Sequence, residues 1–202
     1  MNGSVRVIKI GGSLLSFERL RPAMAQWLDR QKPATDVIVV GGGKLAEVIR
    51  EMDALHQIGD QTGHWLCVTL MSVSAQLLSQ IVPRVRLIDS YETLVHSIEA
   101  DEPQRIVFVT ERFLREHEQT LPGPKCSHDW LTTSDTIAAR LAIAISADEL
   151  VLAKSLSVPP DTTRQHAAQE GFVDARFPLV AGAMRVRWVN LRDPNHTETV
   201  LR

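Results

Sequence analysis

Short apolar runs that end at glycines alternate with amphipathic segments in the first 56 residues. Val5–Ile10 and Val37–Val40 are β-branched runs, and continuous apolar runs of this length are typical of strands buried on both faces of a parallel sheet. Between them, residues 17–31 repeat apolar side chains on one helical face, namely Leu20, Met24, Trp27 and Leu28. A second helix is predicted to begin at Lys44. Strands that alternate with helices in this way predict an α/β fold.

The rest of the chain continues the alternation less regularly. Helical periodicity is found over residues 64–81 and again over 134–146, where Ser134 is the predicted N-cap and the buried stripe is Ile137, Leu141 and Ile145. Further strands are predicted at residues 85–88, 106–109, 149–153 and 186–191. The polar stretch 116–133 reads as a long loop, and residues 155–185 give no clear pattern. We therefore expect one α/β domain over residues 1–202.

Composition narrows the class of protein. The chain has 202 residues, with 22 Lys and Arg against 24 Asp and Glu, so a strongly basic nucleic-acid binder is excluded. Two isolated cysteines, Cys67 and Cys126, cannot make a disulfide framework and suit a reducing compartment. The sequence shows neither a signal-peptide pattern nor an apolar run of the roughly 18 residues that a membrane span needs. We expect a cytoplasmic protein that binds neither membrane nor nucleic acid.

Two glycine-rich turns that follow buried strands are the strongest chemical signal. Gly11-Gly12 ends the first strand and Gly41-Gly42-Gly43 ends the second, so a parallel sheet brings both turns to its carboxyl edge. Glycine lets the backbone approach a phosphate closely, and the amides and helix N-terminus that follow offer positive partial charge. Lys9 lies two residues before the first pair, within reach of the same phosphates. Alternatively, each glycine segment is only a tight turn that binds no ligand.

Two further charged residues are placed near this edge by the predicted elements. Asp135 lies in the first turn of the helix after Ser134, where it either caps the helix or orients lysines and a nucleotide-bound metal. Lys154 ends an apolar strand, so it either points into the crevice with the glycine turns or extends into solvent. Seven histidines include His56 and His64, but their spacing is not that of metal ligands, and we expect no metal held by the protein.

Known phosphate-binding motifs fit poorly. The spacing G-x-x-x-x-G-K-[ST] does not occur, which excludes a P-loop. Residues 41–46 satisfy a loose dinucleotide fingerprint, but they follow the second strand, and the acidic residue about 20 positions on, Asp60, lies in a predicted loop. A nicotinamide-dependent dehydrogenase is therefore only a remote alternative.

Taken together, three motifs resemble the amino-acid kinase superfamily, which includes acetylglutamate, aspartate, uridylate and isopentenyl phosphate kinases. They are Lys9-Ile10-Gly11-Gly12-Ser13, Val40-Gly41-Gly42-Gly43 and Ser134-Asp135-Thr136-Ile137-Ala138, in the family's order. A narrower resemblance, to an aspartokinase-related branch that phosphorylates [5-(aminomethyl)furan-3-yl]methyl phosphate in methanofuran synthesis, is carried by His64-Trp65, residues 130–135 and Gly171-Phe172-Val173-Asp174. The resemblance implies a three-layer αβα sandwich with a mostly parallel sheet and transfer of the γ-phosphoryl group of Mg-ATP.

Site roles follow from the same resemblance. It implies Lys9, Asp135 and Lys154 as catalytic residues. It implies a nucleotide and phosphate site at Gly11, Gly12, Ser13, Ser134 and Ser155, and an acceptor site at Gly41, Gly42, Gly43 and His64. The cofactors implied are ATP and Mg²⁺, the substrate is a small molecule, and the partner is a second copy of the chain, with the helix over residues 64–81 as the candidate surface. A phosphate monoester acceptor needs no strong general base, because it is already anionic near neutral pH.

Two departures from the family pattern leave alternatives open. The G-G-M-x-x-K segment of larger members corresponds to residues 180–185, which hold no lysine, so either Lys154 or Arg185 supplies that charge or the charge is missing. Pro159-Pro160 stands near the usual Asp-Gly pair at the nucleotide. The alternatives are a kinase acting on a nucleoside monophosphate or a carboxylate, and a non-catalytic protein that binds nucleotides or oxyanions.

Overall fold

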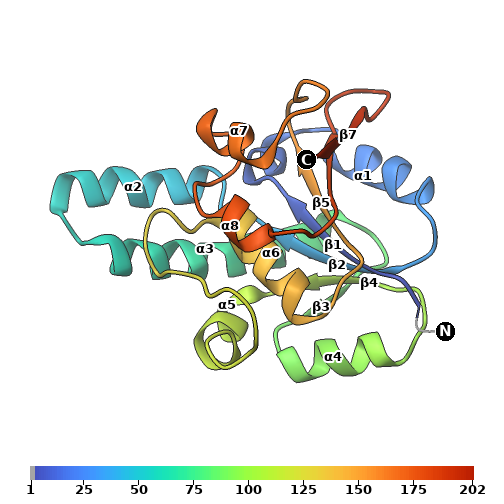
Figure 1. Cartoon of the computed structure of the whole chain (residues 1–202), viewed down its shortest axis with the longest axis horizontal. Coiled ribbons are helices and arrows are strands. Elements are labelled where there is room, and N and C mark those ends of the chain that lie inside the picture. The colour runs from blue at the N-terminus through green and yellow to red at the C-terminus, as the bar shows by residue number, and fades with distance from the viewer. Residues whose placement is uncertain (1–2) are drawn as a thin grey trace.

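The strands form one sheet through the middle of the molecule (Figure 1). The structure is a computed structural model and describes residues 3–202. Within that range the sheet has seven strands in the order β3-β4-β2-β1-β5-β6-β7, all parallel to their neighbours except β7. Their bounds are β1 Val5–Ile10, β2 Thr35–Val40, β3 Arg86–Ile88, β4 Arg105–Phe108, β5 Glu149–Lys154, β6 Val186–Asn190 and β7 Glu198–Leu201.

The central strands divide their side chains between two apolar layers. In β1, Val5 and Val7 belong to one core, whereas Ile8 and Ile10 belong to the other, as the two-residue period of a strand requires. The first core is covered by α4 (Tyr91–Glu99), α6 (Ser134–Ala144) and α8 (Phe177–Ala181). The second is covered by α1 (Leu20–Asp29) and the last turns of α3 (Asp60–Ile81). The α/β sandwich with a mostly parallel sheet is confirmed.

Most predicted elements are present, with shifted ends. The helix predicted over residues 17–31 begins at Leu20, and a short 3₁₀ helix, η1 (Gly12–Ser16), precedes it. The stretch 116–133 is mostly irregular, after a short helix α5 (Thr110–Arg112) and a π-helical turn, η2 (Phe113–His117). Four elements were not expected from the sequence: α4, α7 (Arg164–Gln169), α8 and β7. Apart from α4, these lie in the C-terminal part of the chain, where each element has four to six residues.

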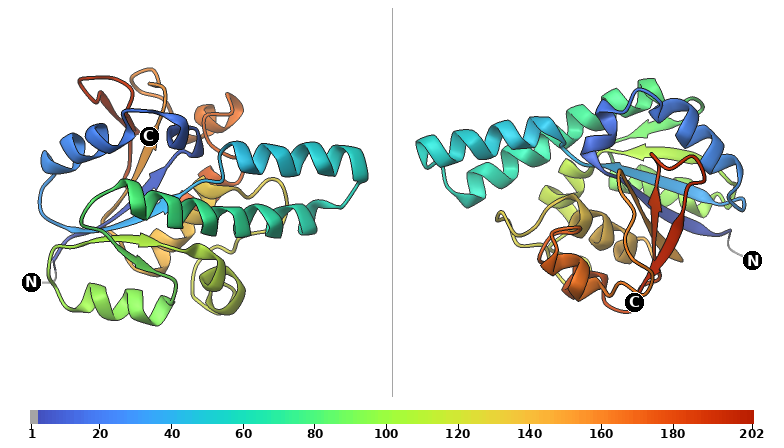
Figure 2. Two further views of the ribbon diagram at one scale, coloured as in Figure 1. Left: turned by 180° about the vertical axis from the view of Figure 1, so that it is seen from behind. Right: turned by 90° about the horizontal axis from the view of Figure 1, so that it is seen from above.

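A helical hairpin projects from the body of the molecule. Helix α2 (Lys44–His56) leaves the second glycine turn and packs against α3, and both views in Figure 2 show the pair extending away from the sheet. None of the residues of α2 is buried. No helix within the described range combines the length and apolar character that a membrane crossing needs. Because α2 begins at the second glycine turn, the hairpin of α2 and α3 forms one wall beside the carboxyl edge of the sheet.

Candidate functional site

The two glycine turns touch each other at the carboxyl edge. A Cβ atom added to Gly12 would lie 2.1 Å from the backbone nitrogen of Gly43, and one added to Gly43 would lie 2.6 Å from the carbonyl oxygen of Gly12. Gly43 also has a φ of +57°, a backbone angle that residues other than glycine rarely adopt. Glycine is therefore required at both positions by the contact itself. The backbone of the two turns, without side chains, therefore lies between the C-terminal ends of β1 and β2.

Lys9, Asp135 and Lys154 meet beside these turns. The Lys9 ammonium lies 2.8 Å from one carboxylate oxygen of Asp135, and the Lys154 ammonium lies 2.8 Å from the other. The three side chains come from β1, the first turn of α6 and the end of β5. Lys9 and Asp135 are each only 4% exposed. Two ammonium groups therefore share the one carboxylate that they contact, in a buried place.

Burial and mutual charge set the protonation of this cluster. Burial alone would raise the pKa of Asp135, but the ammonium groups of Lys154 and Lys9 outweigh it and lower that pKa to about 2. Burial lowers the pKa of Lys154 to about 8, against the attraction of Asp135 and with the help of the Lys9 charge. Asp135 is therefore ionised at neutral pH, and the pKa of Lys154, at about 8, lies close to neutral pH.

The hydroxyl groups predicted for the nucleotide site lie around the same edge. Ser13 and Ser155 follow β1 and β5, and their hydroxyl oxygens are 3.1 Å apart. The Ser134 hydroxyl packs against Gly41, whose added Cβ would lie 2.8 Å from it. Gly11 donates its backbone N–H to the carbonyl of Ala153 at 2.8 Å, which ties the first turn to the end of β5. These contacts place the residues predicted for the nucleotide site at the same edge of the sheet as the lysine cluster.

Ser134 is not the N-cap of α6, so that prediction is wrong. The cap position belongs to Thr133, and its own side chain makes no capping hydrogen bond. The backbone N–H of Thr136 donates instead to Asp174, at 3.0 Å. Asp174 lies far from this helix in the sequence. In the sequence it is marked only by the resemblance of residues 171–174 to the aspartokinase-related branch.

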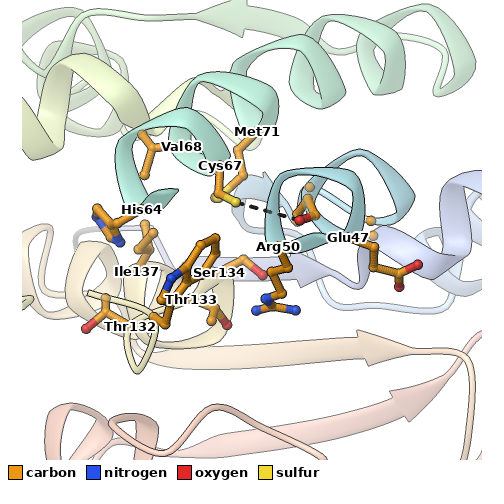
Figure 3. Close-up of a pocket in the computed structure, with 16 residues that line it drawn as sticks. Glu47, Arg50, His64, Cys67, Val68, Met71, Thr132, Thr133, Ser134 and Ile137 are labelled. Atoms are coloured by element: carbon orange, nitrogen blue, oxygen red, sulfur yellow. Dashed lines mark hydrogen bonds between the residues drawn. The ribbon is translucent and has the colours of Figure 1, made fainter. Parts of the chain in front are cut away.

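A cavity of about 190 Å³ opens in front of the glycine turns. Its walls come from α2, α3 and residues 130–134, and Figure 3 shows side chains from all three around it. His64 lines the cavity from α3; its Nε2 atom is buried and has no hydrogen-bond partner within residues 3–202. Burial, followed by the proximity of His128, lowers the pKa of His64, which favours a neutral ring. Glu47 and Arg50 add charges from the exposed side of α2.

Trp130 fastens the long loop to the helical hairpin beside this cavity. Its indole N–H donates to a carboxylate oxygen of Asp53 at 2.8 Å, and Arg50 lies over the ring at 5.5 Å. A Cβ added to Gly63 would lie 2.2 Å from the indole, so the ring occupies the place of a side chain. Closer to its start, the loop is held by the fully buried ion pair between Arg140 and Glu118, at 2.7 Å.

Arg185, the other candidate cation, lies away from the Lys9–Asp135–Lys154 cluster. It precedes β6 at the amino edge of the sheet, where its backbone carbonyl accepts from Leu150 and its guanidinium lies 3.6 Å from Glu149. Its side chain is 66% exposed. Of the two groups, Lys154 alone contacts Asp135.

Comparison with known proteins agrees with this architecture. The sequence model of the amino acid kinase family matches residues 4–157, about three quarters of the chain. The chain belongs to the amino acid kinase family. One relative is the [5-(aminomethyl)furan-3-yl]methyl phosphate kinase of Methanocaldococcus jannaschii, 25% identical over 151 residues, which are 74% of this chain and 65% of that protein.

Solved structures of amino acid kinase family enzymes share the fold. The UMP kinase of Ureaplasma parvum superposes with a TM-score of 0.69 at 16% identity, covering 100% of this chain and 97% of that one. The aspartate kinase of Synechocystis superposes with a TM-score of 0.60 at 20% identity, covering 98% of this chain and 40% of the other. At 16% and 20% identity, the likeness to these two structures concerns the fold.

Within the described residues the protein supplies no ready-made metal site. No group of three or more His, Cys, Asp or Glu side chains between residues 3 and 202 is placed to hold an ion. Both oxygens of Asp135, the acidic residue at the centre of the cluster, contact lysines.

Proposed function

We propose that this protein is an ATP-dependent kinase, acting as one domain, that transfers the γ-phosphoryl group of Mg-ATP to a phosphate monoester. The acceptor that we favour is [5-(aminomethyl)furan-3-yl]methyl phosphate, and the product is then a diphosphate. The observation that carries the proposal is the pair of ammonium groups, Lys9 and Lys154, around the single carboxylate of Asp135, next to the two glycine turns. Phosphoryl transfer spreads negative charge over a loose transition state, and fixed cations and amides stabilise that charge.

The roles of the residues follow from their positions. Lys9 and Lys154 neutralise the phosphoryl group in transfer, and Asp135 holds the two ammonium groups in place. Gly11, Gly12, Ser13, Ser134 and Ser155 hold the nucleotide phosphates. Gly41, Gly42, Gly43 and His64 face the acceptor, whose phosphate oxygen attacks the γ-phosphorus while the bond to the β-phosphate oxygen breaks and ADP leaves.

The acceptor assignment rests on the relative and on the cavity. The Methanocaldococcus jannaschii relative is named for a small acceptor that carries an amine, a furan ring and a phosphate. The cavity offers partners for such a molecule, with opposite charges at Glu47 and Arg50 and apolar walls at Val68, Met71 and Ile137. Uridine monophosphate is the main competitor, because UMP kinases share the fold.

Phosphorus NMR with Mg-ATP tests the proposal. The purified protein is incubated with the aminomethylfuran phosphate and, in parallel, with UMP. A new diphosphate doublet that grows together with ADP supports the kinase and identifies the acceptor. Turnover of UMP alone would keep the chemistry but change the substrate. ATP binding without ADP formation on either acceptor would favour a protein that binds nucleotides without catalysis.

We further propose a homodimer formed through α3. Leu66, Leu70, Val73 and Leu77 are spaced four, three and four residues apart, which puts them on one face of the helix. Leu66, Val73 and Leu77 are each more than 40% exposed. A second copy that presents the same stripe would bury it. Light scattering after size-exclusion chromatography should give twice the 22.5 kDa chain mass, and Val73→Lys should reduce it to one chain.

A further inference from the structure

The helix that carries Asp135 is capped from a distant part of the chain. One oxygen of the Asp174 carboxylate accepts hydrogen bonds from the backbone N–H of Thr133 at 3.2 Å, the Thr133 hydroxyl at 2.9 Å and the backbone N–H of Thr136 at 3.0 Å. The Thr136 hydroxyl donates to its other oxygen. The whole first turn of α6, with Asp135 in its middle, is therefore fastened to one side chain.

The same short segment also holds the lysine on the opposite side of Asp135. The Lys154 ammonium donates to the backbone carbonyl of Phe172 at 2.9 Å, in addition to its contact with Asp135. Residues 172–174 thus contact Lys154 directly, through Phe172, and the helix turn on both sides of Asp135, through Asp174. The remaining groups around the Lys154 ammonium are Lys9 from β1 and the ring of Trp188 from β6, at 5.3 Å.

A carboxylate is an unfavourable choice if capping were its only task. Burial, and then the charge of Asp135, raise the pKa of Asp174, although its bonds to Thr136 and Thr133 act in the opposite direction. A serine or asparagine caps a helix about as well without bringing a second negative charge next to Asp135. Four hydrogen bonds to one carboxylate, in contrast, hold the turn more rigidly than a single capping hydroxyl does.

We propose that Asp174 is a positioning residue of the phosphoryl-transfer site: through the first turn of α6 it holds Asp135 where the carboxylate engages Lys9 and Lys154 together. This inference rests on the proposed function for its kinetic consequence but not for its structural one. The alignment of Asp135 with Lys154 can be measured without ATP, an acceptor or turnover.

The direct test is a titration of the lysine side chains by NMR. The chain has five lysines, Lys9, Lys32, Lys44, Lys125 and Lys154, so a protein grown with ¹³C-labelled lysine gives few signals. The Lys154 signal is assigned by its loss in Lys154→Met. In the unmodified protein its titration should have a midpoint of about 8. If Asp135 moves away, Lys154 loses the attraction that holds its proton, and its midpoint should fall by roughly half a unit or more.

Variants at Thr136 separate positioning from simple loss of charge. Asp174→Asn removes a negative charge as well as bonds, so its shift alone is ambiguous. Thr136→Val keeps the Asp174 charge and removes one hydrogen bond, whereas Thr136→Ser keeps the hydroxyl. We expect the Lys154 midpoint to fall in Thr136→Val and to return in Thr136→Ser. Both variants remain informative if Asp174→Asn does not fold.

Loss of an ordinary helix cap is the matched control. Ser90 caps α4 through the backbone N–H of Thr93 at 3.2 Å, far from the lysine cluster, so Ser90→Ala should lower stability without moving the Lys154 midpoint. With an active acceptor, Asp174→Asn and Thr136→Val should lower kcat by roughly 10-fold or more while the KM for ATP changes less. An unchanged midpoint and an unchanged kcat in both folded variants would overturn the proposal. An inactive unmodified protein with the expected titration shifts would instead reject the kinase function alone.

Discussion

The central strands carry charged clusters toward both ends, and the two clusters are built differently. In the amino-edge network, Arg6 contacts Asp36 at 3.0 Å and Glu149 at 2.9 Å. Arg187 contacts Glu149 at 2.8 Å and Glu198 at 2.9 Å. With Arg185, three guanidinium groups face three carboxylates, so the network is electrically balanced without any ligand.

The carboxyl-edge cluster of Lys9, Asp135 and Lys154 is not balanced. It has two cations for one anion, little access to water, and two glycine turns alongside it. Concentrating like charge in a buried site costs stability, and that cost falls when an anion binds. Buried charge alone therefore does not indicate a functional site in this protein. The excess of one sign, beside open backbone, is what points to a phosphate ligand.

Removing a cation from each cluster should give the largest difference in kcat between the two edges of the sheet. Lys9→Met and Lys154→Met are each expected to lower kcat by roughly 10³-fold, because each removes a charge that stabilises the transferring phosphoryl group. Asp135→Asn should have an effect of similar size, since both lysines lose their anchor. The matched control is Arg187→Met in the amino-edge network, which should lower the free energy of unfolding and leave kcat of the folded protein unchanged. Near-normal turnover in either lysine variant would refute the assigned roles.

Substitution of Gly63 tests whether the wall of the cavity belongs to the acceptor site. An alanine there would place its Cβ 2.2 Å from the Trp130 ring, so the ring must move away from Asp53. We expect Gly63→Ala to raise the KM for the acceptor by roughly 10-fold and to leave the KM for ATP nearly unchanged, because the lysine cluster is untouched. Ser79→Ala, near the other end of α3, serves as the control. A rise in the KM for ATP instead would place Trp130 on the nucleotide side.

The pH dependence should separate activity from stability at the lysine cluster. Since the pKa of Lys154 is lowered to about 8, kcat/KM for ATP should fall by up to ~10-fold per unit above pH 8 as the ammonium loses its proton. The stability contribution has the opposite sign. Between pH 8 and the ordinary lysine value of 10.5 the unfolded chain binds more protons, so this group makes the folded state more stable as pH rises. The pH profile of the Lys154→Met variant should lack both trends.

Local patterns predicted the parts of the site that depend on neighbouring residues. The strands β1, β2 and β5, the two glycine turns and the helix after residue 134 are each encoded within about ten residues, by apolar runs and breakers. A parallel sheet then brings Lys9, Lys154 and the glycine turns to one edge without further information.

The features that were missed depend on contacts across the chain. Asp174 caps a helix that begins 40 residues earlier, so no local capping pattern marks it, and Ser134 was the natural but wrong choice. Trp130 matters because Gly63 leaves space for its ring. The short elements α7, α8 and β7 have too few residues to show a period.

Substitution of Arg185 should have the smallest effect on kcat and stability, and it tests whether the two clusters have different roles. Sequence alone left open whether Lys154 or Arg185 supplies the charge of the missing lysine, or whether that charge is missing. They lie at opposite edges of the sheet, and Arg185 meets Glu149 at 3.6 Å with two thirds of its side chain exposed. An exposed ion pair of this kind contributes at most about 1 kcal/mol, so Arg185→Ala should change kcat less than ~2-fold and stability only slightly. Steady-state kinetics and urea unfolding of this variant beside Lys154→Met measure both quantities. A large loss of kcat in Arg185→Ala would mean that the balanced network also serves catalysis, and the distinction between the two edges would fail.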